Sequence, residues 1–203
     1  MARVERTGDS RCTQLTSKVI VGCLPSLTLI LGQQEPFMAK FDEEAILGLF
    51  ESNLKTAKAS LASLGFCCCK APSFQGLSGW VFEQTVQDCL RKELKCLGIR
   101  AEIREQVSLG GRVKADLVVG PLAVEIKARG LFDRNAASRY RSYRVAAEGK
   151  GYSYLYLTLQ ESHLPYRSAI LKAVGRRNTF FLDMPGDWSR LMKRVVQLLT
   201  GRR

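Results

Sequence analysis

The chain has 203 residues, of which 46% are hydrophobic, and it carries a formal net charge of +12. This length and apolar content suit one globular domain with a single core. The positive charge favours a polyanionic partner, for which nucleic acid is the obvious candidate. The apolar run at residues 18–32 is too short and too interrupted to span a membrane, so we expect no membrane partner.

The first 70 residues are expected to precede the main domain. Met38 begins a sensible domain by itself, so residues 1–37 are predicted to be a poorly ordered N-terminal extension. Residues 38–70 are predicted to contain one amphipathic helix, at 41–64, because acids come early, lysines come late and apolar residues recur at helical spacing. This helix is expected to pack on the main domain, residues 71–203, or to dimerise.

The main domain shows alternating helical and strand patterns. Phe82, Val86, Leu90 and Leu94 recur at helical spacing, which predicts a helix that faces a sheet and ends at Gly98. The elements expected next are a strand at 99–107, a hairpin at 112–129, a helix at 134–149 and a strand at 152–159. The tail is predicted to add a helix at 165–174, a strand at 179–182 and a helix at 188–199. The predicted class is therefore α/β.

The hairpin is predicted to bring charged side chains together. With Gly120 and Pro121 as the two turn residues, counting outward along both strands places Asp116 directly opposite Glu125. Lys127 shares the face of Glu125, because side chains alternate along a strand. Two carboxylates at this spacing repel each other, and a hard divalent cation such as Mg²⁺ would turn the repulsion into coordination. The alternative is a pair of water-facing edge-strand charges with a lysine as their salt-bridge partner.

The arrangement of Asp116, eight further residues and then Glu125-Ile126-Lys127 resembles the PD-(D/E)xK, or restriction-endonuclease-like, nuclease superfamily. Ala115 stands where the superfamily's name has proline, which is often absent there. The resemblance implies an αβββαβ core with a mixed central sheet flanked by helices, here with an N-terminal helical extension. It implies that Asp116, Glu125 and the backbone carbonyl of Ile126 bind Mg²⁺, for which Mn²⁺ would substitute, and that Lys127 is catalytic. Glu83, on the preceding helix, resembles a further metal-binding glutamate of the superfamily.

Basic residues cluster beside the proposed site. Residues 127–150 hold seven Lys or Arg against two acids. We predict that nucleic acid contacts this cluster through Arg129, Arg139, Tyr140, Arg141 and Arg144. Tyr140 and Arg144, one helical turn apart, are the candidates for an additional active-site residue, which the resemblance implies for the helix after the lysine. An ordinary solvated basic helix face is the alternative for each of them.

Other chemistries find little support in the sequence. Seven cysteines, an odd number without a Cys-x-x-Cys pair, favour reduced packing thiols of a cytoplasmic protein over disulfides or a zinc site. The single histidine, His163, is expected in a surface loop. The sequence contains no phosphate-binding Gly-Lys-Ser/Thr loop, no dinucleotide fingerprint and no Gly-x-Ser-x-Gly motif.

The sequence therefore predicts a Mg²⁺-dependent endonuclease or exonuclease that hydrolyses phosphodiester bonds, expected in DNA, through Glu83, Asp116, Glu125 and Lys127. One alternative is a module of the same fold that has lost catalysis and binds nucleic acid or a protein partner. Another is an interaction protein with no nucleic-acid role. Double-strand cleavage often needs two active sites, so the sequence leaves a homodimer open.

Overall fold

The computed structural model describes residues 40–63, 74–130, 136–159 and 164–201. The expected extension at 1–37, the cysteine run at 67–69 and His163 lie outside the described residues. The chain from Pro36 to Arg203 forms one compact unit, and the helix predicted at 41–64 belongs to it.

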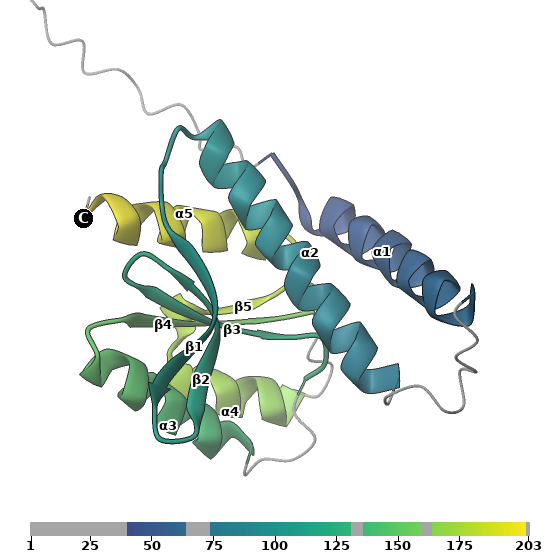
Figure 1. The fold of residues 1–203 in the computed structure, drawn as a ribbon. Helices are drawn as coiled ribbons and strands as arrows, with labels where there is room; N and C mark the ends of the chain where they lie inside the picture. The colour runs from purple at the N-terminus through teal and green to yellow at the C-terminus, as the bar shows by residue number, and fades with distance from the viewer. Residues whose placement is uncertain (1–39, 64–73, 131–135, 160–163, 202–203) are drawn as a thin grey trace, which may run out of the picture. The chain divides into compact units, whose positions relative to one another are not determined.

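The described elements follow the predicted order of helices and strands (Figure 1). They are α1 (Glu43–Ser63), α2 (Phe74–Cys96), β1 (Ile103–Gly110), β2 (Val113–Val119), β3 (Leu122–Lys127), α3 (Ala136–Gly149), β4 (Ser153–Thr158), α4 (Leu164–Val174), the 3-10 helix η1 (Arg176–Asn178), β5 (Thr179–Phe181) and α5 (Asp187–Thr200). α3 connects β3 to β4, and α4 connects β4 to β5.

The strands form one five-stranded mixed sheet in the order β1-β2-β3-β4-β5. β1, β2 and β3 pair antiparallel, whereas β3, β4 and β5 pair parallel. α1, α2 and α5 share the core on one face of the sheet, and α3 and α4 share the core on the other (Figure 1). The predicted α/β class, with a mixed sheet flanked by helices, is confirmed. Among the helices of the described ranges, none is both long and apolar enough to cross a lipid bilayer.

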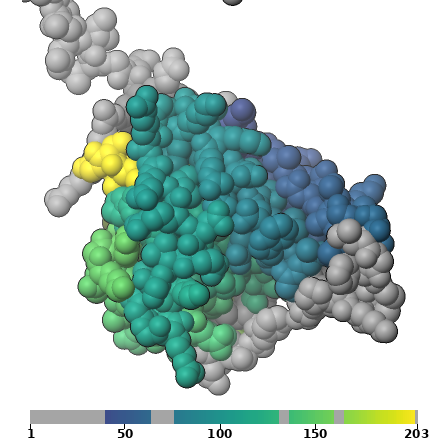
Figure 2. Space-filling view, in the orientation of Figure 1, coloured from purple at the N-terminus to yellow at the C-terminus, as the bar shows by residue number. Residues whose placement is uncertain are grey.

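α2 packs on the sheet through the stripe that its sequence predicts. Phe82, Val86, Leu90 and Leu94 are each no more than 3% exposed and belong to the same core as β3. α1 lies beside α2 (Figure 2), and the ring of Phe50 packs edge-to-face on Phe82 with 5.4 Å between the ring centroids. Packed between α1 and the sheet, α2 is a fixed support for the polar residues on its remaining side.

The first strand starts later than predicted. The expected strand at 99–107 is wrong at its start, because β1 begins at Ile103 and runs to Gly110. Gly98 has φ +67 where α2 ends, and the N–H of Ile99 donates to the carbonyl of Leu94 at 2.9 Å. That bond belongs to the C-terminal cap of the helix, so the amide of Ile99 is already used and strand pairing begins only after the chain has left the cap.

The β2–β3 hairpin has the predicted turn. Gly120 has φ +54, a conformation that favours glycine, and Val119 pairs with Leu122 on either side of the turn. A Cβ on Gly120 would lie 2.9 Å from Cδ2 of Leu199, so α5 also leaves little room for any larger residue here. The turn therefore fixes the register of the strands that carry the charged residues.

Candidate functional site

Three charged side chains meet at the C-terminal end of β3. Nζ of Lys127 lies 2.9 Å from Oδ2 of Asp116 and 2.7 Å from Oε1 of Glu125. The predicted convergence of these charges is confirmed. β2 and β3 are interior strands of the sheet and the side chain of Glu125 is 4% exposed, so the alternative of water-facing edge-strand charges is wrong.

The backbone is irregular around Asp116. Ala115 packs in the core under α3 and α4, whereas Leu117 packs in the core under α2, although residues two apart on a regular strand share a face. Across from this point on β1, Gln106 has φ +49, an uncommon conformation for a residue with a side chain. Asp116 therefore lies where the alternation of side chains reverses, and it has neighbours on both sides of the sheet.

Asp116 also ends the regular pairing of β2 with β3. The ladder stops at Leu117 and Val124, and the N–H of Ile126 donates to Oδ2 of Asp116 at 2.8 Å. The expected pair of Asp116 with Glu125 is thus not part of the ladder, because a side-chain oxygen has replaced a strand carbonyl as the acceptor. The two carboxylates consequently have different neighbours although they share Lys127.

A cleft of about 190 Å³ opens on the α2 side of this junction. Its lining residues come from α2 and the first three strands: Trp80, Glu83, Gln84, Gln87, Glu105, Gln106, Asp116, Leu117 and Ile126. Glu83 and Asp116 thus share the cleft, as expected for a helix glutamate near the hairpin. Glu125 and Lys127 are not among the described residues that line the cleft. Their charges act on the pKa of Tyr140 of α3.

The site is short of positive charge. Burial raises the pKa of Glu83 to about 7, and Asp116 adds to this shift while Lys127 opposes it. Burial likewise raises the pKa of Glu125 to about 7, with Asp116 again adding and Lys127 opposing. For Lys127, burial acts to lower the pKa, but Glu125 and Asp116 outweigh it and raise the pKa above its ordinary value. Three carboxylates therefore share the charge of one ammonium.

The structure brings together two of the predicted carboxylate ligands. Glu83, Asp116 and Glu125 do not form a compact three-acid cluster, and no three His, Cys, Asp or Glu side chains do so within the described ranges. Asp116 and Glu125 are joined through Lys127, and the backbone of Ile126 lies beside Asp116. Oε2 of Glu125 is buried and has no hydrogen-bond partner among the described residues, which is costly for a carboxylate oxygen.

Tyr140 of α3 lies next to the charged residues. It is buried, and its ring centroid is 4.8 Å from that of Tyr156 on β4. Burial raises the pKa of Tyr140, and the charges of Lys127 and Glu125 also act on it. Tyr140 therefore packs behind the charged pair as part of the core under α3.

The predicted basic contacts differ in their surroundings. Arg144 donates to the carbonyl of Val174 at 3.3 Å and pairs with Glu148 at 3.5 Å, so its guanidinium is engaged at the end of α4. The residues left exposed are Arg129, Arg139 and Arg141. The exposed arginines, rather than Arg144, are the ones positioned to meet a ligand from solvent.

Sequence reasoning missed a polar stripe on α2 that faces β1. Glu83, Gln87 and Arg91 follow one another at intervals of four residues, so they lie on one side of the helix. The amide of Gln87 donates to Glu105 of β1, and Arg91 pairs with Glu105 at 3.6 Å. The four-residue interval is the signal that would have found this stripe. Trp80, which is 57% exposed beside the cleft, has no comparable signal.

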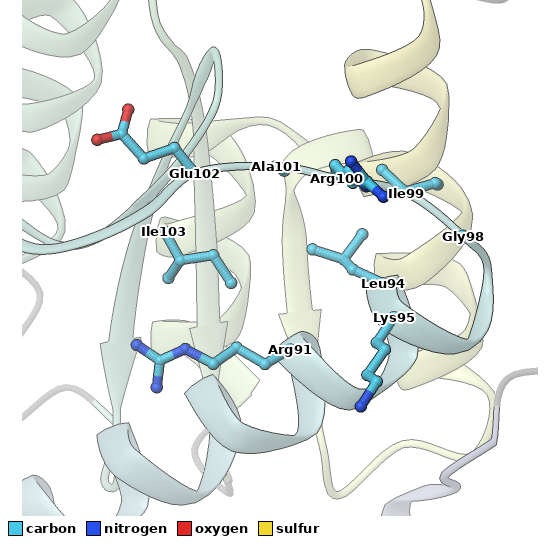
Figure 3. A pocket seen from close by; sticks show the side chains of 9 residues that line it. All are labelled: Arg91, Leu94, Lys95, Gly98, Ile99, Arg100, Ala101, Glu102 and Ile103. Carbon is cyan, nitrogen blue, oxygen red and sulfur yellow. The ribbon is translucent and has the colours of Figure 1, made fainter. Parts of the chain in front are cut away.

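A larger groove, of about 920 Å³, lies at the C-terminal end of α2 and the start of β1 (Figure 3). Leu94 and Ile103 point toward each other across it, and Arg91, Lys95 and Arg100 add three cations to its lining. None of the charged residues of the hairpin is among the described residues that line it. Its size therefore does not make it the reaction site.

Comparisons of the chain with protein-family models, with curated proteins and with solved structures found no match. The chemistry of the site is therefore interpreted from its geometry alone. Two carboxylates held by one ammonium, beside a cleft that contains a third carboxylate, present oxygen atoms of the kind that hard divalent cations take as ligands.

Proposed function

We propose that the chain is a Mg²⁺-dependent nuclease of the restriction-endonuclease-like fold that hydrolyses phosphodiester bonds in DNA. The observation that carries the proposal is the position of the Lys127 ammonium, 2.9 Å from Asp116 and 2.7 Å from Glu125, beside the cleft that contains Glu83. Asp116, Glu125 and the backbone carbonyl of Ile126 would bind the metal together with Glu83, and Lys127 would be catalytic.

The order of the elements supports this fold assignment. α2, β1, β2, β3, α3 and β4 follow the αβββαβ order that the resemblance implies. β1, β2 and β3 are antiparallel, and β4 pairs parallel with β3. α2 and α3 contribute to the cores on opposite faces, so the charged end of the hairpin lies between two helices that each bring residues near it.

The charges of the site fit a divalent cation. Mg²⁺ takes oxygen ligands, commonly one or two carboxylates together with waters and phosphate oxygens. When ionised, Glu83, Asp116 and Glu125 carry three negative charges against the one positive charge of Lys127. Oε2 of Glu125, which accepts no hydrogen bond from the described residues, would be a further oxygen ligand for the metal. A bound Mg²⁺ would supply polarisation of a phosphoryl oxygen and a lowered pKa of a coordinated water.

Lys127 and Glu83 are suited to different tasks. Because its pKa is raised, Lys127 keeps its proton at neutral pH and can stabilise the negative charge that develops on the phosphate during attack. The same property makes it a poor acceptor of a proton from water. Glu83, which lines the cleft together with Asp116, would instead serve as a ligand of the metal.

The exposed cations near the hairpin suit a polyanionic substrate. Contacts from Arg129, Arg139 and Arg141 to phosphate groups would position DNA without reading its sequence, and salt would weaken them. We assign Tyr140 to positioning the side chains of Glu125 and Lys127. We assign Arg144 to holding α3 against the end of α4, where it donates to the carbonyl of Val174.

Purified protein should cleave at least one of plasmid, linear, branched and single-stranded DNA in Mg²⁺. EDTA should stop the reaction, because the metal would lower the pKa of the water that attacks the phosphate. Mn²⁺ should restore it. If neither metal supports cleavage while DNA binds with a steep salt dependence, the chain is a binding module on this fold. If DNA and RNA fail to bind even at low salt, a nucleic-acid role is wrong.

Mg²⁺ should stabilise the protein more at about pH 8 than at about pH 5.5. The pKa values of Glu83 and Glu125, both about 7, lie above the ordinary value of 4.5. In metal-free protein their contribution to stability is therefore fully present below pH 4.5 and is lost as the pH rises through 7. Mg²⁺ binds the deprotonated carboxylates, so the gain in thermal midpoint should be about 3–5 °C at the higher pH and near zero at the lower.

Glu125→Gln is the control for this measurement. The variant keeps the volume of the side chain but loses a ligand charge, so Mg²⁺ should no longer raise its thermal midpoint at the higher pH. An equal gain at both pH values, or a gain that the variant retains, would contradict metal binding by Glu125.

A further inference from the structure

A second charged feature lies where η1, β5 and α5 meet. A pocket of about 440 Å³ there is lined by Arg177 of η1 and by Arg190, Lys193, Arg194 and Gln197 of α5. All but one of these residues are cations, and no described residue that lines the pocket is acidic. The pocket shares no residue with the candidate metal site.

Helical spacing gathers the charges of α5 on one side. Arg190, Lys193, Arg194 and Gln197 stand at positions i, i+3, i+4 and i+7, which form one face of a helix. The buried residues of α5 are Trp188, Leu191, Met192 and Val195. The apolar face of α5 thus packs on the sheet while its cations are directed to the pocket beside η1.

The guanidinium of Arg190 is held in a fixed position. It donates to both carboxylate oxygens of Asp187, at 3.0 and 2.9 Å, and to the carbonyls of Arg176 and Thr179 at 3.0 and 2.6 Å. It also lies 4.5 Å from the centroid of the Phe180 ring. A group held by this many contacts loses little freedom when it binds a ligand.

The other cations of the pocket lack an acidic partner in the contacts of the described residues. Arg194 donates to the amide oxygens of Asn178 at 3.2 Å and Gln197 at 2.9 Å, which are neutral acceptors. Arg177 and Lys193 are exposed at the pocket. Only the guanidinium bound to Asp187 has an acidic partner among these contacts, so about three positive charges face one small space.

We propose that this pocket binds phosphate groups and that they belong to the backbone of a nucleic acid. Cations gathered at this spacing repel one another, and a phosphate between them removes the repulsion. Arginine presents a fork of N–H donors that matches phosphate oxygens. The described lining has no aromatic or aliphatic residue to hold a base or a sugar, which favours a backbone contact that reads no sequence. This contact is additional to the metal site and does not require that the protein cleaves.

Charge reversal at the pocket tests the proposal. Arg177→Glu with Lys193→Glu is compared with Lys55→Glu and Lys172→Glu on α1 and α4, which are exposed and lower the net charge equally. Affinity for a fluorescein-labelled DNA duplex is measured by anisotropy in EDTA over a range of salt concentrations. The pocket variant should bind about tenfold more weakly than the control, and the slope of log K against log salt should fall by about two.

Inorganic pyrophosphate distinguishes the two sources of the phosphate. Pyrophosphate offers phosphate oxygens without an extended backbone, so at equal concentration it should raise the thermal midpoint of the wild type less than the duplex does. If pyrophosphate stabilises the wild type but not the pocket variant, and both variants bind DNA equally, the site serves a small phosphorylated ligand and the backbone assignment is wrong. Equal DNA affinity without pyrophosphate stabilisation overturns the proposal altogether.

Folding and cleavage are controlled separately. Arg177→Gln with Lys193→Gln repeats the binding measurement with a milder change if charge reversal lowers the thermal midpoint. Because binding is measured without metal, a loss of DNA affinity confined to the pocket variant supports the site whether or not the wild type cleaves DNA.

Discussion

Lys127→Ala should slow metal-dependent DNA cleavage on the order of 10³-fold. The ammonium lies 2.9 Å from Asp116 and 2.7 Å from Glu125, so it is placed where the proposed metal and the attacked phosphate would meet. Its removal takes away a positive charge that stabilises the transition state. Water that enters in its place must reorient during the reaction, so it stabilises the transition state less well than a fixed charge. The rate is measured as loss of intact substrate with enzyme in excess.

The same variant should bind Mg²⁺ at least as tightly as the wild type. Without the ammonium, Asp116 and Glu125 lose their counter-charge, and a divalent cation becomes more favourable between them. A lysine that served only as a salt-bridge partner would behave differently, because Mg²⁺ would then restore both the fold and the rate. Slow cleavage by a folded, metal-binding variant therefore identifies a catalytic role.

Lys114→Ala is the matched control for this comparison. Lys114 is exposed on β2, two residues before Asp116, and should be replaceable without a change in rate. Circular dichroism in Mg²⁺ shows whether each variant is folded. Cleavage by Lys127→Ala at the wild-type rate would contradict the assignment of Lys127 as catalytic.

The parts of the site that follow local rules were predictable from the sequence. The turn at Gly120 sets the register of the hairpin, and that register carries Asp116, Glu125 and Lys127 to the same place. The apolar stripe of α2 places Glu83 at the cleft. Turn geometry and helical periodicity act over about a dozen residues, so one sequence is enough to reveal them.

The parts that depend on contacts between distant segments were not predictable. Gln106 has a positive φ although glutamine does not favour that conformation. Across from it on β2, Ala115 and Leu117 face opposite cores although they are two residues apart, so the alternation of side chains reverses at Asp116. The basic pocket likewise exists only because β5 brings η1 beside α5. The late start of β1 is a local effect by contrast, because the amide of Ile99 is used in the cap of α2 by the carbonyl of Leu94.

Glu93→Ala should lower the free energy of unfolding by about 3–5 kcal/mol. Glu93 is 2% exposed, and its carboxylate accepts hydrogen bonds from three donors. These are the N–H of Phe41 at 2.8 Å, the N–H of Lys40 at 3.0 Å and the indole N–H of Trp188 at 3.3 Å. The carboxylate thus joins the segment before α1 to α2 and α5, and alanine would leave all three donors without their acceptor.

Two further variants separate the charge of Glu93 from its volume. Glu93→Gln keeps the volume and one acceptor oxygen, so its loss should be about 1–2 kcal/mol. Glu51→Ala, an exposed acid on α1, should change stability by less than about 0.5 kcal/mol. Urea unfolding measures each value, and Glu93→Ala should lower the thermal midpoint by about 10 °C. Because Glu93 does not line the cleft with Glu83, cleavage well below that midpoint should be unchanged. A Glu93→Ala variant as stable as the wild type would mean that this carboxylate does not hold α1 on the domain.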